Sequence, residues 1–272
     1  YIQRTAALLQ QGVSVNPIAV YLPLADVFAK YGSGALHIDE ELEKHLGREL
    51  FDELRRAGYD FDLINDRALE RDAKVDGDRL RVGAGAYSVV IVPGVRFMPP
   101  ESLERLAEFA ESGGVVIFIE RLPEAAPGIA QQQERTARLR TALRKFRGDR
   151  ELAPGETASL GSGKVVVARD HAAVLSDIRA GLQPDCLIIE AGGNSEEELQ
   201  FARANVGFLH RRLGSADFYF LSNISNHAQK LQVQFAAGQR KPQRWDPEMG
   251  DCDVSLVYSF PSARDGTGQG TT

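Results

Sequence analysis

Hydrophobic residues in this chain form short uninterrupted runs, separated by stretches whose apolar positions recur at helical spacing. The runs at 18–22, 87–92 and 115–119 are rich in Val and Ile, which is typical of strands buried on both faces. A charged stretch at 39–57 places a leucine every four residues on one face of a predicted helix. Because such strands and helices alternate along the first 200 residues, the pattern predicts an α/β fold, a flavodoxin-like parallel sheet with flanking helices.

The clearest unit is a strand, a helix and a second strand between residues 87 and 119. Pro93-Gly94 turns the chain after the first strand, Pro99-Pro100 begins the helix, and Gly113-Gly114 ends it. A crossover of this kind joins parallel strands. The same criteria predict strands at 59–64 and 164–168 and helices at 131–147 and 172–180.

After residue 205 the pattern changes. Residues 217–223 are apolar and aromatic, and 230–235 alternate between apolar and polar side chains, which is typical of half-exposed antiparallel strands. Residues 245–250 read as a turn, and the Gly- and Thr-rich tail at 262–272 is predicted to be disordered. The predicted organisation is a helix at 1–12, an α/β domain at 13–204 and an antiparallel β region at 205–261.

Composition places the chain among ordinary globular proteins. Its 272 residues are 43% hydrophobic and 26% charged, enough for one large domain or two smaller ones. Lys and Arg number 32 against 38 Asp and Glu, for a net charge of −6, and there is no long basic run. These features argue against a nucleic-acid partner and against a membrane partner, and no apolar run approaches the ~18–20 residues of a membrane span.

The two cysteines exclude two classes of protein. Cys186 and Cys252 are far apart in the sequence, with no CxxC pair and no histidine cluster. This spacing excludes a disulfide scaffold and a zinc site of usual spacing, and we predict no metal site. One disulfide and two free buried thiols both remain open, and the composition favours the thiols.

Nothing in the sequence identifies a catalytic residue. The turn Pro93-Gly94 follows a buried strand, where an amidotransferase would carry a cysteine and an α/β hydrolase a Gly-x-Ser-x-Gly elbow. The Gly-rich segments at 83–86 and 161–163 precede strands, so they read as turns and not as phosphate-binding loops. Glu120 lies at a strand end, but a glycosidase needs two carboxylates across one bond, and no such pair is recognisable.

Two polar clusters carry alternative interpretations. Asp60, Asp62, Asn65 and Asp66 could supply oxygen ligands to calcium, but strand alternation followed by a helix N-cap at Asn65 or Asp66 explains them better. The run 210–212, His-Arg-Arg, is the densest donor group in the chain. It could bind a sugar or, with Asp217, form a surface salt-bridge network.

Three stretches together resemble the α-L-rhamnosidases of glycoside hydrolase family 106. They cover most of residues 1–250: the helix and strands at 1–12, 18–22 and 58–65, the unit at 87–117 and the segments at 207–212, 217–223 and 245–250. The resemblance implies that 1–12 is the last helix of a catalytic barrel, that 13–204 is a non-catalytic amidotransferase-like domain and that 205–261 begins a β-sandwich. The catalytic carboxylates would then precede Tyr1 in a longer protein.

The resemblance further implies an accessory role in a carbohydrate-degrading enzyme, secreted or periplasmic, that removes a terminal deoxy-sugar such as L-rhamnose. The chain would pack against the upstream barrel, and His210, Arg211 or Asn223 would line one wall of the substrate cleft. No cofactor is expected in this chain, although calcium is associated with the family's barrel. The alternative is a stand-alone, non-catalytic binding or sensing module of amidotransferase-like fold.

Overall fold

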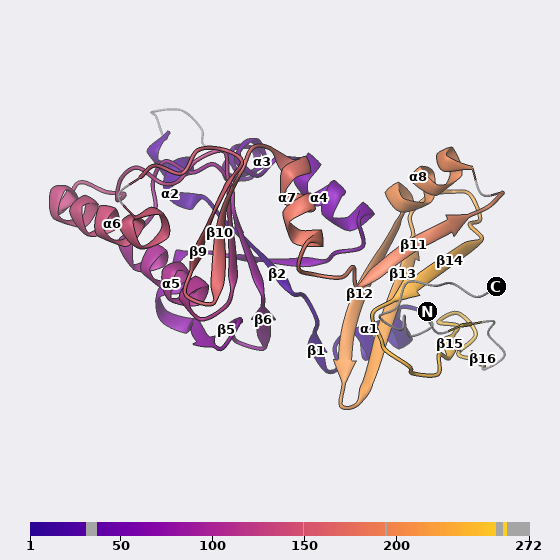
Figure 1. The fold of residues 1–272 in the computed structure, drawn as a ribbon. Coiled ribbons are helices and arrows are strands. Elements are labelled where there is room, and N and C mark those ends of the chain that lie inside the picture. The colour runs from indigo at the N-terminus through magenta and orange to yellow at the C-terminus, as the bar shows by residue number, and fades with distance from the viewer. Residues whose placement is uncertain (31–36, 149, 194, 254–257, 260–272) are drawn as a thin grey trace, which may run out of the picture.

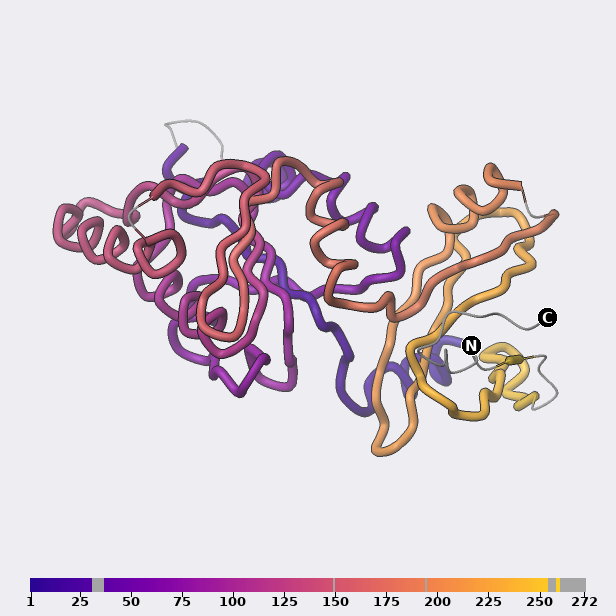
Figure 2. Tube along the Cα trace, viewed as in Figure 1, coloured from indigo at the N-terminus to yellow at the C-terminus, as the bar shows by residue number. Residues whose placement is uncertain are grey.

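A computed structural model describes residues 1–30, 37–148, 150–193, 195–253 and 258–259. The chain forms an α/β lobe around a six-stranded sheet and a second lobe of antiparallel strands (Figure 1). It passes between the lobes twice, once from β1 into β2 and once from α7 into β11 (Figure 2). The predicted tail at 262–272 lies outside the described residues.

The large sheet has the strand order β3-β2-β7-β8-β10-β9, and all neighbours are parallel except the β9–β10 pair at one edge. Its strands are β2 (Ile18–Tyr21), β3 (Phe61–Ile64), β7 (Val89–Val92), β8 (Val115–Ile119), β9 (Glu156–Leu160) and β10 (Gly163–Ala168). The apolar runs therefore do form parallel strands, as predicted, and β9 makes the sheet mixed.

Successive strand residues face opposite sides of this sheet and enter two separate cores. In β7, Val90 and Val92 pack under one layer of helices, whereas Val89 and Ile91 pack under the other. The first layer contains α5 (Pro100–Glu111), α6 (Gln132–Arg147) and the short π-helix η1 (Ala68–Asp72); the second contains α3 (Ile38–Leu46), α4 (Arg48–Arg56) and α7 (His171–Arg179). Burial on both faces explains why β2, β7 and β8 lack polar alternation.

The continuous helix predicted at 39–57 is wrong, because the chain breaks into α3 and α4 at Gly47. This residue has φ +68°, a conformation that side chains with a Cβ rarely adopt. A Cβ there would also lie 2.9 Å from Cε1 of His171, on α7. The break lets both helices follow the sheet while α7 packs beside α4.

A small antiparallel sheet, absent from the prediction, precedes β7. It consists of β4 (Lys74–Asp76), β5 (Arg79–Val82) and β6 (Gly85–Tyr87). Gly83 turns the chain between β5 and β6 with φ +58°, as expected of a turn. Leu80 of β5 is fully buried in the core under α5, so this sheet extends that layer.

Over the residues that the structure describes, the second lobe holds three antiparallel sheets. Its elements are α1 (Ile2–Leu9), β1 (Val13–Ser14), β11 (Cys186–Ala191), α8 (Glu196–Asn205), β12 (Val206–Leu213), β13 (Ala216–Asn223), β14 (Leu231–Phe235), β15 (Arg244–Trp245) and β16 (Cys252–Asp253). β12 pairs with β1 and β13, and β11 pairs with β14 under α8. The β11–β14 pairing therefore places β11 and α8 beside the antiparallel strands.

We predict that Gly163→Ala strongly destabilises the α/β lobe. A Cβ at Gly163, the first residue of β10, would lie 2.2 Å from the carbonyl oxygen of Gly114 and 2.4 Å from that of Ala110. Because both obstacles are backbone atoms, the loss in unfolding free energy should be at least about 2 kcal/mol. Urea unfolding measures it.

Gly207→Ala is the matched control, because Gly207 also lies in a strand and a Cβ added there would have no atom within 4 Å. The control should stay within about 0.5 kcal/mol of the parent chain. Equal stability of the two variants would refute this account of the β8–β10 contact.

Candidate functional site

The side chain of His210 lies in a buried ionic cluster. On β12 it is 2% exposed, with Nδ1 2.9 Å from Oδ2 of Asp185 and Nε2 3.0 Å from Oδ1 of Asp217. The Tyr219 ring stacks on the imidazole at 4.0 Å, and its hydroxyl donates to Asp185 over 2.9 Å. Each ring nitrogen is therefore within hydrogen-bond distance of a carboxylate.

Arginines complete the charge balance of the cluster. Arg212 Nε lies 3.0 Å from Oδ1 of Asp217, and Arg240 forms an ion pair with the other oxygen. The Asp217 side chain is only 3% exposed, so its desolvation must be offset by these partners. Burial, together with the neighbouring Asp185 charge, raises the pKa of the Tyr219 hydroxyl well above its ordinary value. The predicted network with Asp217 exists, but it is buried and not on the surface.

The cluster ties the inter-lobe connection to the second lobe. Asp185 immediately precedes β11, where the chain leaves the α/β lobe, and its backbone N–H donates to Gly58 of that lobe over 2.8 Å. With both nitrogens occupied, His210 offers no free ring atom to a ligand. It can affect a ligand site only by holding β11, β12 and β13 in position.

Arg211 and Asn223 lie in other surroundings. Neighbouring strand residues face opposite ways, so Arg211 leaves the His210 side and donates to the carbonyl oxygens of Gln11 and Gly12, over 2.6 and 3.0 Å. Asn223 pairs with Val206 at the far end of the β12–β13 ladder, and its side-chain oxygen accepts from the N–H of Ser225. The three residues predicted to contact a sugar therefore lie at three separate places in the structure.

The four residues considered as calcium ligands, 60, 62, 65 and 66, also do not form one site. Asn65 Oδ1 accepts from the N–H of Ala68 over 3.0 Å, which confirms the predicted N-cap role. The Asp62 carboxylate accepts hydrogen bonds from the Asn16 amide and the Tyr87 hydroxyl. The Asp66 carboxylate accepts hydrogen bonds from the hydroxyl groups of Tyr21 and Ser102. In the part of the chain that the structure describes, no three His, Cys, Asp or Glu side chains are grouped to hold a metal.

No cysteine is poised as a nucleophile. Cys186 and Cys252 are both free; Cys186 is buried, but Cys252 is exposed, contrary to the prediction of two buried thiols. Burial raises the pKa of Cys186 to about 12, which keeps the thiol protonated at neutral pH. Glu120, at the end of β8, has φ +65° in a tight turn closed by the N–H of Arg121 on the carbonyl of Ile119.

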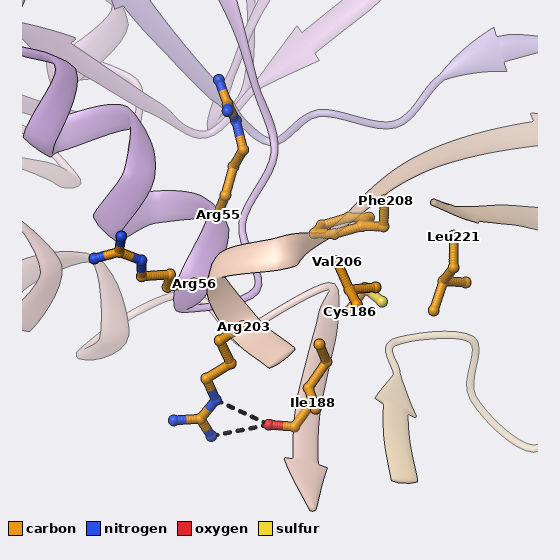
Figure 3. A pocket seen from close by; sticks show the side chains of 8 residues that line it. All are labelled: Arg55, Arg56, Cys186, Ile188, Arg203, Val206, Phe208 and Leu221. Carbon is orange, nitrogen blue, oxygen red and sulfur yellow. Dashed lines mark hydrogen bonds between the residues drawn. The ribbon is translucent and has the colours of Figure 1, made fainter. Parts of the chain in front are cut away.

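One pocket lies where the two lobes meet, between α4, β11, β12 and β13 (Figure 3). Arg203 donates twice to the carbonyl of Ile188, over 3.0 and 2.9 Å, and Arg55 and Arg56 direct their guanidinium groups away from the apolar floor. The cavity volume is about 10 Å³, room for one water molecule at most. This is a packing seam and not a ligand site.

A second, larger pocket lies at the carboxyl edge of the parallel sheet, with a volume of about 660 Å³. Its size is within the range of small-molecule sites. The lining is mostly apolar: Leu24, Ala25, Phe28, Ala29, Asn65, Asp66, Arg67, Phe97, Pro127, Gly128, Ile129 and Gln132. The sequence did not predict this pocket. The one general indication is that ligands of α/β sheets bind beyond the carboxyl ends of strands.

None of the helices within the described ranges is long and apolar enough to cross a membrane. Comparison with known proteins gives one family. A model of glycoside hydrolase family 106, described as alpha-L-rhamnosidase, matches residues 1–259. A rhamnosidase structure from Novosphingobium sp. PP1Y is similar with a TM-score of 0.67 and 25% identity, over 93% of this chain and 21% of that one.

Two further relatives extend the comparison. A putative beta-glucuronidase of Formosa agariphila is 22% identical over 95% of this chain and 18% of its own length. A beta-galactosidase structure from Bacillus circulans sp. alkalophilus is 16% identical, with a TM-score of 0.54 over 92% of this chain and 41% of that one, which shows similarity of fold alone. The chain thus spans about a fifth of the rhamnosidase and of the glucuronidase.

We predict that Asp185→Asn destabilises the chain by about 2–3 kcal/mol, because it replaces a buried carboxylate that lies 2.9 Å from Nδ1 of His210 and accepts from the Tyr219 hydroxyl with an amide that has only one acceptor oxygen. The exposed Asp251 provides the control variant, Asp251→Asn, which should be close to neutral. Urea unfolding compares the two, and hydrogen exchange should show faster opening of β12 in Asp185→Asn. Equal stabilities would contradict an ionic role for the cluster.

We predict that Asp60→Asn stabilises the chain at neutral pH. Burial raises the pKa of Asp60 from its ordinary 3.8 to about 6, so the folded state penalises ionisation of this carboxyl. The penalty is absent below pH 3.8, grows between 3.8 and 6 and is constant above. At about 1.4 kcal/mol per pKa unit it has an upper limit near 3 kcal/mol, and partial hydration reduces the expected gain to about 1–2 kcal/mol.

Unfolding free energies of the parent chain and of Asp60→Asn, measured from pH 4 to 8, test this. The difference should approach zero near pH 4 and reach a plateau above pH 6. The exposed Asp72→Asn serves as control. A gain that does not depend on pH would mean that burial of the Asp60 charge is not its cause.

Proposed function

The chain belongs to the alpha-L-rhamnosidase family, glycoside hydrolase family 106, and we propose that it is a non-catalytic accessory region of a larger enzyme of this family. One observation carries the proposal. Glycoside hydrolysis ordinarily requires two carboxylates across the scissile bond. Of the two pockets described above, the seam has no acidic side chain and the carboxyl-edge pocket has one, Asp66, whose Oδ1 accepts hydrogen bonds from Tyr21 and Ser102.

The catalytic carboxylates are accordingly proposed to lie in a barrel domain that precedes this chain. Relatives of which the chain spans about a fifth support this division, because most of their length is available for catalysis elsewhere. The names of two relatives, a rhamnosidase and a putative beta-glucuronidase, support a parent substrate that contains L-rhamnose and uronic acid units.

The α/β lobe is proposed to be a non-catalytic, amidotransferase-like domain. The parallel strands β3-β2-β7-β8-β10 follow the 2-1-3-4-5 order of flavodoxin-like sheets, which supports this assignment. The protonated thiol of Cys186 and the turn Pro93-Gly94, which replaces a nucleophile elbow, support the absence of acyl-transfer chemistry.

The second lobe is proposed to dock on the upstream barrel. Large apolar side chains are exposed on α1 and its N-cap, on β1 and on the strand β12 that pairs with β1: Tyr1, Ile2, Val13 and Leu209. Exposed apolar groups on neighbouring elements are typical of interaction surfaces. Arg211 fixes α1 against β12 from within this surface, so its proposed contribution to the substrate cleft, like that of His210, is to position the elements of that wall. Asn223 is proposed to contribute there through the turn that it stabilises.

We predict that the 272-residue chain alone does not hydrolyse an aryl α-L-rhamnoside, whereas a longer protein that includes the preceding barrel does. The physical reason is that neither of the two pockets described above contains two carboxylates. Release of the chromogenic phenol measures both, with a correctly folded state of the short chain checked by cooperative unfolding. Turnover by the short chain above the uncatalysed rate would overturn the accessory assignment, and inactivity of the longer protein would overturn the rhamnosidase assignment.

A further inference from the structure

The carboxyl-edge pocket is built by the segments that follow four strands of the parallel sheet. α2 (Leu24–Ala29) follows β2, residues 65–67 follow β3, Phe97 follows β7, and residues 127–132 follow β8. The chain passes from β2 outward to β3 and then across to β7, so the sheet reverses its direction of growth at β2 and β7. Open α/β sheets bind ligands at this point.

The pocket walls are held in place before any ligand arrives. The buried carboxylate of Asp26, on α2, accepts the N–H groups of Arg96 and Phe97 over 2.9 Å each, which fixes α2 to the segment after β7. Arg135 donates to the carbonyl of Pro127 over 2.9 Å and holds the third wall. A preformed cavity loses less conformational entropy on binding than a flexible one.

Apolar side chains, some of them exposed to solvent, make up most of the pocket lining. Phe28 is 55% exposed and Ile129 is 94% exposed, although both are large hydrophobic side chains. Phe97 adds a second aromatic ring to the lining. Apolar walls with aromatic rings suit a ligand that presents a C–H face, as the ring of a sugar does.

The polar side chains that line the pocket include the guanidinium of Arg67. Asp66 Oδ1 is engaged by Tyr21 and Ser102, and Asn65 uses its side-chain oxygen for Ala68 but retains its amide N–H groups. Arg67 has no ion pair and no side-chain hydrogen bond with the residues described here, and it lines the pocket. A guanidinium pairs best with a planar carboxylate, which it can bind through two parallel hydrogen bonds.

We propose that this pocket binds a uronate-containing oligosaccharide, with the uronate carboxylate on Arg67 and sugar C–H faces against Phe28 and Phe97. The side-chain amides of Asn65 and Gln132 supply hydrogen bonds to hydroxyl groups. The volume of about 660 Å³ admits a short oligosaccharide. The choice of sugar rests on the proposed function of the parent enzyme; the requirement for an anion with an apolar face rests on the pocket itself.

The test is calorimetric titration of the 272-residue chain with the disaccharide glucuronosyl-rhamnose and with its neutral counterpart, glucosyl-rhamnose. We expect saturable binding of the acidic disaccharide and binding at least about fivefold weaker for the neutral one. Arg67→Ala should weaken binding of the acidic disaccharide by a similar factor, and Phe28→Ala should weaken binding of both. Because Phe28 is half exposed, its replacement should leave the chain folded.

Arg140→Ala is the matched control, since Arg140 is an exposed arginine of α6 that does not line the pocket and has no ion pair with the described residues. It should leave the affinity unchanged. Equal losses in Arg67→Ala and Arg140→Ala would refute a specific carboxylate contact. No saturation by about 10 mM ligand, or tighter binding of benzoate than of the acidic disaccharide, would refute the sugar assignment.

The outcome is separable from that of the proposed function. If the chain does not bind the acidic disaccharide while the longer protein hydrolyses rhamnosides, only the proposed ligand of the pocket is refuted. If the pocket binds the acidic disaccharide and the longer protein is inactive, the rhamnosidase assignment falls and the pocket stands.

Discussion

Burial of the parallel sheet on both faces is the constraint from which the rest of the α/β lobe follows. Strands such as β7 carry no polar side chain on either face, so each face needs a layer of helices. The break at Gly47 lets α3 and α4 cover one face beside α7. The same requirement brings every strand-to-helix segment to the carboxyl edge of the sheet. The large pocket at that edge is thus a consequence of covering the sheet, and only its lining side chains are specific to this chain.

The two lobes are connected by polar contacts more than by a shared apolar core. Each lobe has its own hydrophobic clusters, and the seam between them is lined by three arginines above an apolar floor. Asp185 bridges the lobes, with its backbone on Gly58 and its carboxylate on His210. Replacing both partners of such a buried polar contact with apolar packing would cost little stability, but the contact is directional. It therefore helps to define how the second lobe is oriented relative to the α/β lobe.

Local patterns determined how much could be predicted from the sequence. Buried strands such as β2 and β8, the helix α5 and the N-cap at Asn65 depend on neighbours within a few residues, and these predictions were confirmed. The break at Gly47 depends on His171, and β11 depends on pairing with β14, so both needed contacts distant in sequence. For the same reason Asp217 was linked to the donors at 210–212, whereas Asp185, 25 residues from His210, was missed. The pocket was missed because its lining comes from four separate segments.

The carboxyl-edge pocket lies at the part of the sheet where other α/β folds carry out chemistry. In α/β folds the carboxyl edge of the sheet is where reactive groups gather. Here Pro93-Gly94 follows β7, and the strained turn at Glu120 follows β8, yet the side chains that line the neighbouring pocket are apolar, amide or cationic, apart from the hydrogen-bonded Asp66. The lining thus offers apolar surface, amide groups and a guanidinium, which are groups that can contact a ligand. The proposed recognition of a ligand at this edge therefore depends on these lining side chains.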